Sequence, residues 1–570
     1  MEQENFTWEV QKTDEHIVEL LKNKLDISKA IARTLSLRGV KDFNSAQDFF
    51  RPKWNSFHDG FLMKDMSRSV ERIHNSINEK HNILVYGDYD VDGTCSVAML
   101  SIFLKQFSSN VNLYQPDREN EGYGISLQSV DMMIANKIDL VIALDCGIKD
   151  IKSAKAINDA GIDLIICDHH NPGKIIPQAY SILNPKQREC TYPFKELCGC
   201  GVGFKLIQSY SKKYNIATDY SYLTQLAAIA TTADVVPLVD ENRLITYFGL
   251  EQINQNPIPS IEKIFQLSNT SEFSSSDLIF KVAPRINAAG RLSSAKKATD
   301  FLISNNEELE ILSKEIELIN KERKKIDELI TEEALSQLSN QPSDRFTNLV
   351  FSSDWHKGVV GIVASRIIEN FYKPTIVLTG KGDIITGSAR SVKDFDIYNE
   401  LDKLKHYFIR FGGHKYAAGM SIKKTDLVAF FNDFENAVKN SIQPHMLIPK
   451  IKIDSELSIN ELAKDLKTNN FPKIYRIIKQ MGPFGAGNPT PVFLFKDLKL
   501  FSNPKIVGDK HIKLKFYSDK LNSTIDGIWF NSFNSFNKIR AKKSLNVVAS
   551  LNENHFNGNI SLQLMIKDAK

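Results

Sequence analysis

Apolar and polar residues follow a repeating pattern in the first half of the chain. From residue 80 onward, apolar runs of strand length such as NILVYG, DLVIALDC and DLIICD alternate with longer segments of helical spacing. Strands and helices that alternate in this way are typical of a parallel sheet with helices on both faces. In such sheets the reactive side chains collect beyond the carboxyl ends of the strands. The pattern therefore predicts an α/β domain with its site at that edge.

The rest of the chain shows other patterns. Helical spacing followed by an aromatic, turn-rich stretch marks residues 1 to about 60 as an N-terminal appendage. Residues 306–338 place apolar side chains at steps of three and four on a charged background, which predicts one long helix packed between two lobes. A second α/β pattern follows from 346 to about 450. Residues 451–570 alternate in short runs every 8 to 12 residues, which indicates a small antiparallel barrel.

Composition narrows the class of protein but names no partner. A chain of 570 residues is too long for one hydrophobic core, so several domains are expected. A net charge of +4 over that length implies that any polyanion is met by local basic patches. The chain has no apolar stretch of membrane-spanning length, and its first residues lack the layout of a signal peptide, so we expect a cytoplasmic protein without a membrane partner. The six cysteines are interpreted as reduced packing thiols rather than zinc ligands or disulfides.

Acidic side chains end several of the apolar segments. They are Asp88, Asp90 and Asp92 after NILVYG, Asp145 at the end of DLVIALD, Asp168 with His169 and His170 after DLIIC, and Asp234 after AAIATTA. A single Asp-x-Asp is more often a turn or a helix cap, and a single histidine pair is more often a surface or core feature. The ordered set, with each member at the end of its own element, favours one shared site.

Such a site requires positive charge. Five or six carboxylates in one crevice raise one another's pKa unless cations compensate them. Mixed carboxylate and imidazole ligands suit Mn²⁺ or Mg²⁺ better than Zn²⁺. This many ligands predicts two ions about 3.5–4 Å apart, an arrangement that activates a water and stabilises in-line displacement at phosphorus.

At these residues the chain resembles the DHH phosphoesterase superfamily, whose signature triplet stands here as Asp168-His169-His170. Five further stretches resemble the RecJ family of bacterial single-strand-specific DNA exonucleases: VAPRINAAGRL, WHKGVVGIVASR, GSARSVKDFDIY, GGHKYAAGM and GPFGAGNPTPVF. The resemblance covers roughly residues 60 to 570. It implies an exonuclease that degrades single-stranded DNA 5′ to 3′ and releases 5′-mononucleotides, with two Mn²⁺ or Mg²⁺ ions, in DNA recombination and repair.

The resemblance also assigns roles to the acidic set. The implied metal ligands are Asp88, Asp90, Asp92, Asp145, His169, His170 and Asp234, and the implied catalytic residues are Asp90, His169 and His170. Asp168 is expected to orient a histidine. His170 contacts either a metal or the scissile phosphate. Ala389 and Cys146 depart from the family's usual residues, but neither departure removes a charged group.

A second set is implied to hold the DNA, including a terminal 5′-phosphate. Arginines and small polar residues among glycines suit a phosphate that the backbone approaches closely. The set comprises Arg285, Asn287, Arg291, His356, Ser388, Arg390, Gly412, Gly413 and His414. From the residues alone, a surface ion pair or a helix cap explains the arginines equally well. Arg118 matches a family stretch and either binds substrate or braces its loop.

The expected fold is α/β: a parallel-sheet DHH domain and a second α/β lobe joined by a long helix, with a C-terminal OB-fold barrel. The expected divisions are an N-terminal appendage at 1–60, a DHH catalytic domain at 61–250, a helical connector at 251–342, a substrate-binding domain at 343–448 and a nucleic-acid-binding OB-fold at 449–570. Lysines and aromatic residues of the OB-fold are expected to grip single strands. We expect a monomer, with a single-strand-binding protein and a helicase as candidate partners.

Two other functions compete with this interpretation. A smaller DHH phosphodiesterase acting on short oligonucleotides generally lacks the long helix and the barrel. A non-catalytic scaffold that binds single strands would have lost carboxylates, and none is lost here. The chain has no Gly-x-x-x-x-Gly-Lys-Ser/Thr loop, so we infer neither an ATP requirement nor intrinsic unwinding.

Overall fold

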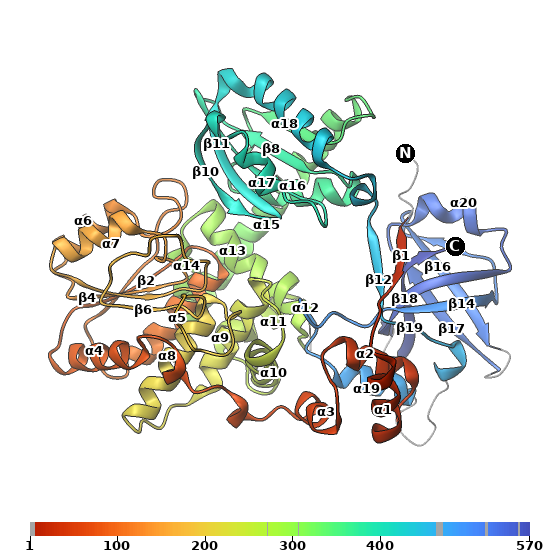
Figure 1. Ribbon diagram of the computed structural model, residues 1–570, viewed down its shortest axis with the longest axis horizontal. Coiled ribbons are helices and arrows are strands. Elements are labelled where there is room, and N and C mark those ends of the chain that lie inside the picture. Colours follow the sequence, from red (N-terminus) through yellow and green to blue (C-terminus); the bar gives the residue numbers. More distant parts are fainter. Residues whose placement is uncertain are drawn as a thin grey trace. The chain divides into compact units, whose positions relative to one another are not determined.

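The protein forms two compact units in a computed structural model that describes residues 6–268, 270, 272–305, 307–462, 471–518, 522–556 and 559–570. The first, called here the parallel-sheet unit, comprises Arg51–Arg323 and Gly482–Pro489. The second, the barrel unit, comprises Met1–Phe50, Lys324–Met481 and Thr490–Lys570. Figure 1 shows the elements of both, coloured along the chain.

The parallel-sheet unit is built on five strands. Their order in the sheet is β3 (Val111–Tyr114), β2 (Ile83–Gly87), β4 (Leu140–Leu144), β5 (Asp163–Cys167) and β6 (Ser181–Leu183). Every neighbouring pair is parallel. From β2 the chain crosses to β3, and from β4 it crosses the other way to β5, so the crossover direction changes between β2 and β4. The predicted parallel sheet is confirmed.

Helices cover both faces of this sheet because side chains of a buried strand alternate between them. Ile83 and Val85 face one core, and Leu84 and Tyr86 face the other. The first core is formed with α4 (Met66–Asn78), α5 (Val91–Leu104), α8 (Gly199–Lys213) and α9 (Tyr220–Ala233); the second is formed with α6 (Leu127–Ala135) and α7 (Ile151–Asp159) (Figure 1). The unit continues through α10 (Asp240–Gln255), α11 (Pro259–Ser268), α12 (Ser275–Asp277), α13 (Ala283–Leu292) and α14 (Ala295–Ile303).

The long helix is α15 (Glu308–Ser339), as predicted. Leu309, Leu312 and Ile316 near its start are buried in the core of the parallel-sheet unit. Ile330 and Leu338 near its end belong to a core of the barrel unit. The helix therefore supplies apolar surface to both units.

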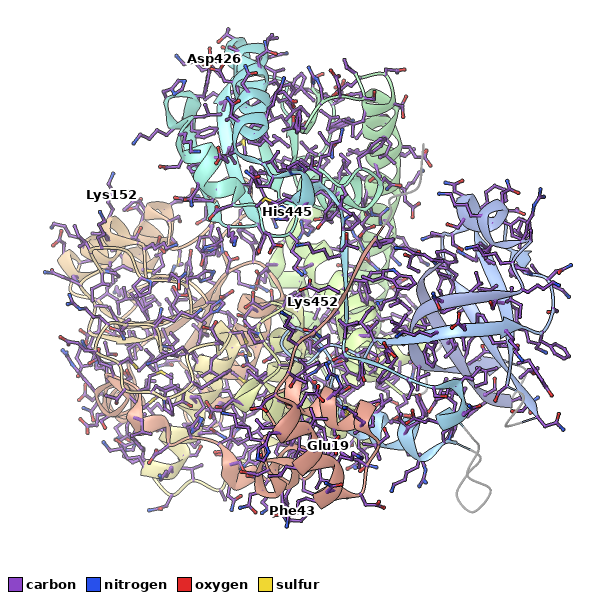
Figure 2. The ribbon with its side chains drawn as sticks, turned by 45° about the vertical axis from the view of Figure 1, so that its right-hand side comes forward. Glu19, Phe43, Lys152, Asp426, His445 and Lys452 are labelled. Carbon is purple, nitrogen blue, oxygen red and sulfur yellow. The ribbon has the colours of Figure 1, made fainter. Side chains whose placement is uncertain are left out.

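The N-terminal segment belongs to the barrel unit. It contains β1 (Thr7–Val10), α1 (Glu15–Leu25), α2 (Lys29–Leu37) and α3 (Phe43–Phe50). Strand β1 pairs in parallel with β12 (Lys450–Ile453), and Arg38 forms a buried ion pair of 2.7 Å with Asp454. Figure 2 labels Glu19 on α1 and Lys452 on β12. Pairing across more than 400 residues of sequence is a non-local contact that local patterns do not encode.

A second sheet of the barrel unit has the strand order β10 (Phe408–His414), β11 (Ala417–Lys423), β9 (Ile384–Arg390), β8 (Thr375–Thr379) and β7 (Asn348–Ser352). Only β7 and β8 are parallel. Helices α16 (Val360–Asn370), α17 (Ile397–Asp402) and α18 (Leu427–Ser441) complete this part. The Gly412-Gly413-His414 stretch is the end of β10 and pairs with β11.

The third sheet is the barrel. Its strands are β13 (Ser455–Glu456), β14 (Phe493–Leu500), β18 (Ser544–Phe556), β19 (Asn559–Ala569), β17 (Ser523–Trp529), β16 (His511–Ser518) and β15 (Lys505–Val507), flanked by α19 (Lys473–Gln480) and α20 (Phe536–Ile539). A further pairing of β14 with β16 closes five of the strands into a ring. The barrel prediction is confirmed, but β17 and β19 run in parallel, so the expectation of a wholly antiparallel barrel was wrong.

All six cysteines are free and buried, as packing thiols are. Within the described ranges, no helix combines the length and the apolar character needed to cross a bilayer.

Candidate metal centre

The first acidic residues lie where β2 passes into α5. Strand β2 ends at Gly87, and the Asp90 carboxylate caps the helix by accepting hydrogen bonds from the N–H groups of Asp92 (2.9 Å) and Gly93 (3.1 Å). A Cβ on Gly93 would lie 2.3 Å from the Asp88 carbonyl oxygen, so only glycine permits this turn. The three aspartates therefore surround a strand-to-helix turn instead of continuing along one strand face.

This turn lies beside the point in the sheet at which the crossover direction reverses. Asp88 follows β2 and Asp145 follows β4, the two strands between which the crossover direction reverses. In parallel sheets the crevice at this point is the usual ligand site. Asp168, His169 and His170 follow β5, the next strand, and Asp234 caps the carboxyl end of α9.

The amino end of α8 holds Asp92. The N–H groups of Gly199 and Cys200 donate to the two oxygens of the Asp92 carboxylate at 2.6 and 2.7 Å. The partial positive charge of a helix amino end stabilises a carboxylate there. A Cβ on Gly199 would lie 2.7 Å from the Asp145 Cα, so α8 can approach both aspartates only with glycine at this position. Sequence reasoning missed these donors, although the CGCG stretch before a helical segment was a usable signal.

His169 lies among carboxylates from three elements. Its Nε2 atom is 3.2 Å from Asp145 Oδ1, 3.6 Å from Asp234 Oδ2 and 3.9 Å from Asp92 Oδ2. Three groups of side chains have ligand atoms within 4.8 Å of one another: Asp88, Asp90 and Asp145; Asp92, His169 and Asp234; and Asp145, His169 and His170. The structure thus brings all seven proposed ligands into overlapping groups.

Asp168 has a different environment from its neighbours. It accepts hydrogen bonds from the N–H groups of Ile148 (2.9 Å), His169 (2.7 Å) and His170 (3.0 Å), and from the His170 ring at 2.8 Å. Burial alone would raise its pKa, but the hydrogen bonds and the charge of His170 lower the pKa to about 2. Tyr123, which sequence reasoning missed, places its hydroxyl 3.0 Å from His170 Nδ1 and donates to the Asp145 carbonyl.

The other buried carboxylates have raised pKa values, including Asp92 with its two amide donors. Burial, and then the negative charge of Asp90, raises the pKa of Asp88 well above its ordinary value and that of Asp92 to about 6. Burial and the charge of Asp92 likewise raise the pKa of Asp145 and of Asp234. In the described part of the chain, one buried oxygen of Asp88, of Asp145 and of Asp234 accepts no hydrogen bond.

These unpaired oxygens fit divalent cations. A buried, unpaired carboxylate oxygen costs free energy unless a cation or a donor meets it. Carboxylate oxygens with imidazole nitrogen form a donor set that suits Mn²⁺ and accommodates Mg²⁺. The clusters could therefore hold metal ions and carry metal-assisted hydrolysis.

Three of the expected phosphate-binding residues lie on α13 of the same unit. Arg285 is buried and paired with Glu317 at 2.8 Å, so its guanidinium is braced by α15. Asn287 lies in the middle of the helix and Arg291 lies near its end. Burial raises the pKa of the Tyr89 phenol, and the positive charge of Arg291 offsets part of this rise. Arg118 stacks over the Tyr89 ring at 4.8 Å and adds positive charge beside Asp88.

The other six lie in the barrel unit and form a second cluster. Across β9, β11 and β10, one row of paired residues is Ser388, Gly419 and Gly412, and the next row on the same face is Arg390, Ala417 and His414. The Arg390 guanidinium donates to Ser388 Oγ at 2.8 Å. A Cβ on Gly361 in the first turn of α16 would lie 3.1 Å from this guanidinium, and His356 precedes that turn. Gly413 lies between the rows on β10.

The GPFGAGNP stretch packs beside the chain that follows Asp234. The Leu238 N–H donates to the Ala486 carbonyl at 2.6 Å, and Arg243 donates to the Gly482 carbonyl at 2.8 Å. Ser275 donates to the Phe484 carbonyl at 2.6 Å. Residues 482–489 therefore belong to the parallel-sheet unit, although their sequence neighbours belong to the barrel unit.

Comparisons with known proteins agree with this architecture. The DHH family N-terminal domain matches residues 82–231, the DHHA1 domain matches 344–440 and the RecJ OB domain matches 453–568. The single-stranded-DNA-specific exonuclease RecJ of Bacillus subtilis is 35% identical over 569 residues, which cover 99% of this chain and 70% of that protein.

Solved structures show the same fold. RecJ of Thermus thermophilus in complex with Mn²⁺ has a TM-score of 0.84 and 23% identity, over 99% of this chain and 79% of that one. An exonuclease RecJ bound to manganese is 28% identical with a TM-score of 0.59, over 67% of this chain and 96% of that one. The chain therefore belongs to the RecJ family of DHH phosphoesterases.

Proposed function

We propose that the protein is a single-stranded-DNA-specific exonuclease that works 5′ to 3′ and releases 5′-mononucleotides by two-metal hydrolysis. The observation that carries the proposal is the set of buried oxygens of Asp88, Asp145 and Asp234 that accept no hydrogen bond among the described residues. Those of Asp145 and Asp234 lie beside the His169 ring. The family's relatives, which carry the name single-stranded-DNA-specific exonuclease, supply the substrate class.

One ion would be held by Asp88, Asp90 and Asp145, and the other by Asp92, His169 and Asp234. When bound, Mn²⁺ or Mg²⁺ supplies an activated water and offsets charge at phosphorus. The chain's own residues position these ligands. The α8 amides orient Asp92, and Asp168 with Tyr123 orients His170, which then contacts a metal or the scissile phosphate.

We assign recognition of the 5′ end of the DNA strand to the phosphate-binding residues. Arg390, with Ser388 and His414 on one sheet face, offers donors of the kind that bind a terminal 5′-phosphate, and Gly412 and Gly413 leave the backbone accessible. His356, Arg285, Asn287 and Arg291 are proposed as further DNA contacts. The braced position of Arg285 favours a supporting role for that side chain.

Single-strand affinity is assigned to the barrel. Phe516 and Trp529 face its interior, so they are not stacking residues. Phe501 and Phe530 are exposed, and Lys515 lies 5.9 Å over the Phe501 ring while the His511 ring contacts Phe530. Exposed aromatic rings beside basic groups are the usual platform for unpaired bases.

The cellular setting is also proposed. DNA recombination and repair would engage the protein as a cytoplasmic monomer, with a single-strand-binding protein and a helicase as partners. The five-part domain division given above stays a prediction.

One experiment tests the activity. Single-stranded DNA labelled separately at each end is incubated with the protein and Mn²⁺, Mg²⁺ or a chelator. We expect the 5′ label to be released first as a mononucleotide, and no release with the chelator. Release of the 3′ label first, or equal cleavage of a fully duplex substrate, would contradict the proposal.

A further inference from the structure

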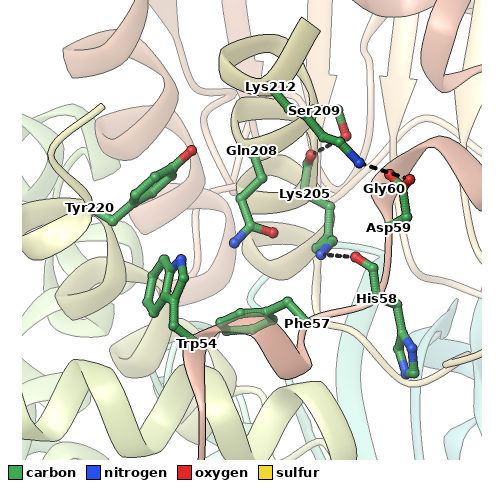
Figure 3. A pocket seen from close by; sticks show the side chains of 10 residues that line it. All are labelled: Trp54, Phe57, His58, Asp59, Gly60, Lys205, Gln208, Ser209, Lys212 and Tyr220. Carbon is green, nitrogen blue, oxygen red and sulfur yellow. Dashed lines mark hydrogen bonds and ion pairs between the residues drawn. The ribbon is translucent and has the colours of Figure 1, made fainter. Parts of the chain in front are cut away.

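A pocket of about 280 Å³ lies in the parallel-sheet unit, between the Trp54–Gly60 segment and one face of α8 (Figure 3). The α8 face presents Lys205, Gln208 and Lys212, which recur at helical spacing. Nothing in the proposed hydrolysis uses this pocket.

One wall of the pocket is aromatic. The Trp54 ring lies 5.1 Å from the Phe57 ring and 5.3 Å from the Tyr220 ring, and Trp54 is 38% exposed (Figure 3). Below it, Phe204 and Phe248 support the indole at 6.3 and 5.2 Å. These rings meet edge to face or tilted, so the partly exposed Trp54 indole is the supported surface on which a planar ring stacks.

The polar groups in the pocket divide into satisfied and unsatisfied ones. The buried Lys205 ammonium donates to the His58 carbonyl at 2.7 Å and pairs with Glu241 at 3.0 Å, and Lys212 at the rim pairs with Asp59 at 2.9 Å. Both lysine charges are therefore matched, and the pocket offers little net charge to a free anion.

Three other polar groups face the pocket without partners. The Gln208 amide, the Trp54 indole N–H and the Tyr220 hydroxyl make no hydrogen bond within the described ranges. The Gln208 amide lies between the aromatic wall and Lys205 (Figure 3). An amide offers a donor and an acceptor side by side, so its natural complement is a ligand edge with both.

The pocket is also separate from the metal centre. Helix α8 begins at Gly199, which donates to Asp92, and it reaches the pocket at Lys205–Lys212. Helix α9 begins with Tyr220 at the pocket and ends at Asp234. With a rise of about 1.5 Å per residue, the pocket lies about 10–20 Å along these helices from the carboxylates.

We propose that this pocket binds a nucleobase, stacked on Trp54 beside Tyr220 and read by the Gln208 amide. Adenine is the best fit, because a glutamine amide pairs with its N6 and N7 atoms. An apolar peptide side chain would leave the amide unsatisfied, and a free phosphate would find both lysines already paired. The base can come from a released mononucleotide or from a single strand.

The first test measures binding of dAMP by calorimetry. The full-length Asp90→Asn variant with a chelator is used, so that the metal centre contributes no product binding. We expect saturable binding that weakens about tenfold or more in Gln208→Leu and in Trp54→Ala. Gln128→Leu, on the exposed surface of α6, is the matched control and should bind like its parent. Gln208→Leu keeps the test decisive if Trp54→Ala fails to fold.

The second test separates the two sources of the base. Single-stranded DNA carrying one 8-azidodeoxyadenosine in a run of deoxyadenosines is irradiated with the same protein. Cross-linking to Trp54 or Tyr220 that Gln208→Leu reduces assigns the base to a strand, whereas dAMP binding without cross-linking assigns it to a free nucleotide. If neither dAMP binding nor cross-linking depends on Trp54 and Gln208, the proposal is overturned.

Discussion

The metal centre and the Ser388–Arg390 cluster are built in opposite ways. In the first, Asp88 and Asp145 are 2% exposed, and each has a buried oxygen without a donor among the described residues. In the second, Arg390 is half-buried with Ser388 as its partner, and Gly412 and Gly413 are exposed on a strand. One cluster is an electrostatically incomplete interior site, and the other is an accessible sheet face.

This difference separates two demands of the proposed reaction. Metal ions must be held in fixed geometry, and burial against helix amides and neighbouring strands supplies that rigidity at a cost in electrostatic free energy. The end of a DNA strand must enter and leave the protein. The groups that bind it therefore lie on an accessible face, where glycines leave the backbone open to contact. Loss of a buried metal ligand should therefore reduce the rate of hydrolysis far more than loss of a surface hydrogen-bond donor.

The largest effect is expected for Asp90→Asn, which removes a charge from the buried cluster but keeps an oxygen for the α5 cap. We expect hydrolysis of single-stranded DNA to fall about a thousandfold, equivalent to about 4 kcal/mol. Asp90→Ala is the companion variant and should lose about 1 kcal/mol more stability through the missing cap. Single-turnover rates with Mn²⁺ and calorimetric melting measure both. An Asp90→Asn rate within tenfold of the parent would contradict the assignment.

The second effect is a dependence of stability on pH in metal-free protein. The pKa of Asp92 rises from 3.8 to about 6 in the folded protein, which corresponds to about 3 kcal/mol. The folded state then binds more protons than the unfolded state between these values, so stability falls as pH rises from about 4 through 6. Asp168 acts oppositely, because its pKa of about 2 makes its contribution disappear only in strong acid.

Melting temperatures between pH 4 and 8, with a chelator and with Mn²⁺, measure this dependence. Mn²⁺ should raise the melting temperature most above pH 6, where the carboxylates are ionised. Equal stabilisation by Mn²⁺ at pH 4 and pH 8 would show that the carboxylates do not bind it.

A smaller effect is expected for Gly199→Ala. The new Cβ would overlap Asp145 and push the α8 amides away from Asp92. We expect Mn²⁺ affinity to fall about 10-fold to 100-fold and stability to fall by about 1–3 kcal/mol. The electron paramagnetic resonance signal of free Mn²⁺ reports the affinity. Gly382→Ala, where a Cβ meets no atom within 4 Å, is the matched control.

The smallest effect is expected for Arg390→Ala. Loss of the guanidinium should reduce the preference for 5′-phosphorylated over unphosphorylated ends about tenfold while leaving Mn²⁺ binding unchanged. Arg390→Lys keeps the positive charge without the paired donors of the planar guanidinium, and it should recover part of the preference. Competition between the two kinds of end measures it. An equal loss of activity on both kinds of end would show that Arg390 does not recognise the 5′-phosphate.

Much of this architecture could be read from local patterns. The segments NILVYG, DLVIALD and DLIIC coincide with β2, β4 and β5, because an apolar run bounded by turns is sufficient to specify a buried strand. Parallel connection then places the carboxyl ends of these strands at one edge, which is why the sequence alone groups the aspartates. The apolar side chains at steps of three and four predicted the long helix in the same way.

Contacts between distant segments could not be read in that way. Three contacts join residues that no helical or strand periodicity connects. They are the α8 amides with Asp92, the Tyr123 hydroxyl with His170, and the Ala486 carbonyl with the Leu238 N–H. The pairing of β1 with β12 likewise joins segments more than 400 residues apart.

The sequence by itself determined which residues carry charge, which segments form strands and helices, and which family the motifs resemble, because these depend on residue type and short spacing. Only the tertiary structure decided which carboxylates are satisfied by donors and which remain unpaired. Asp168 and Asp145 follow adjacent strands, yet the first has a lowered pKa and the second a raised one. Burial and hydrogen-bond geometry arise from the whole packed fold, and they separate an orienting carboxylate from candidate metal ligands.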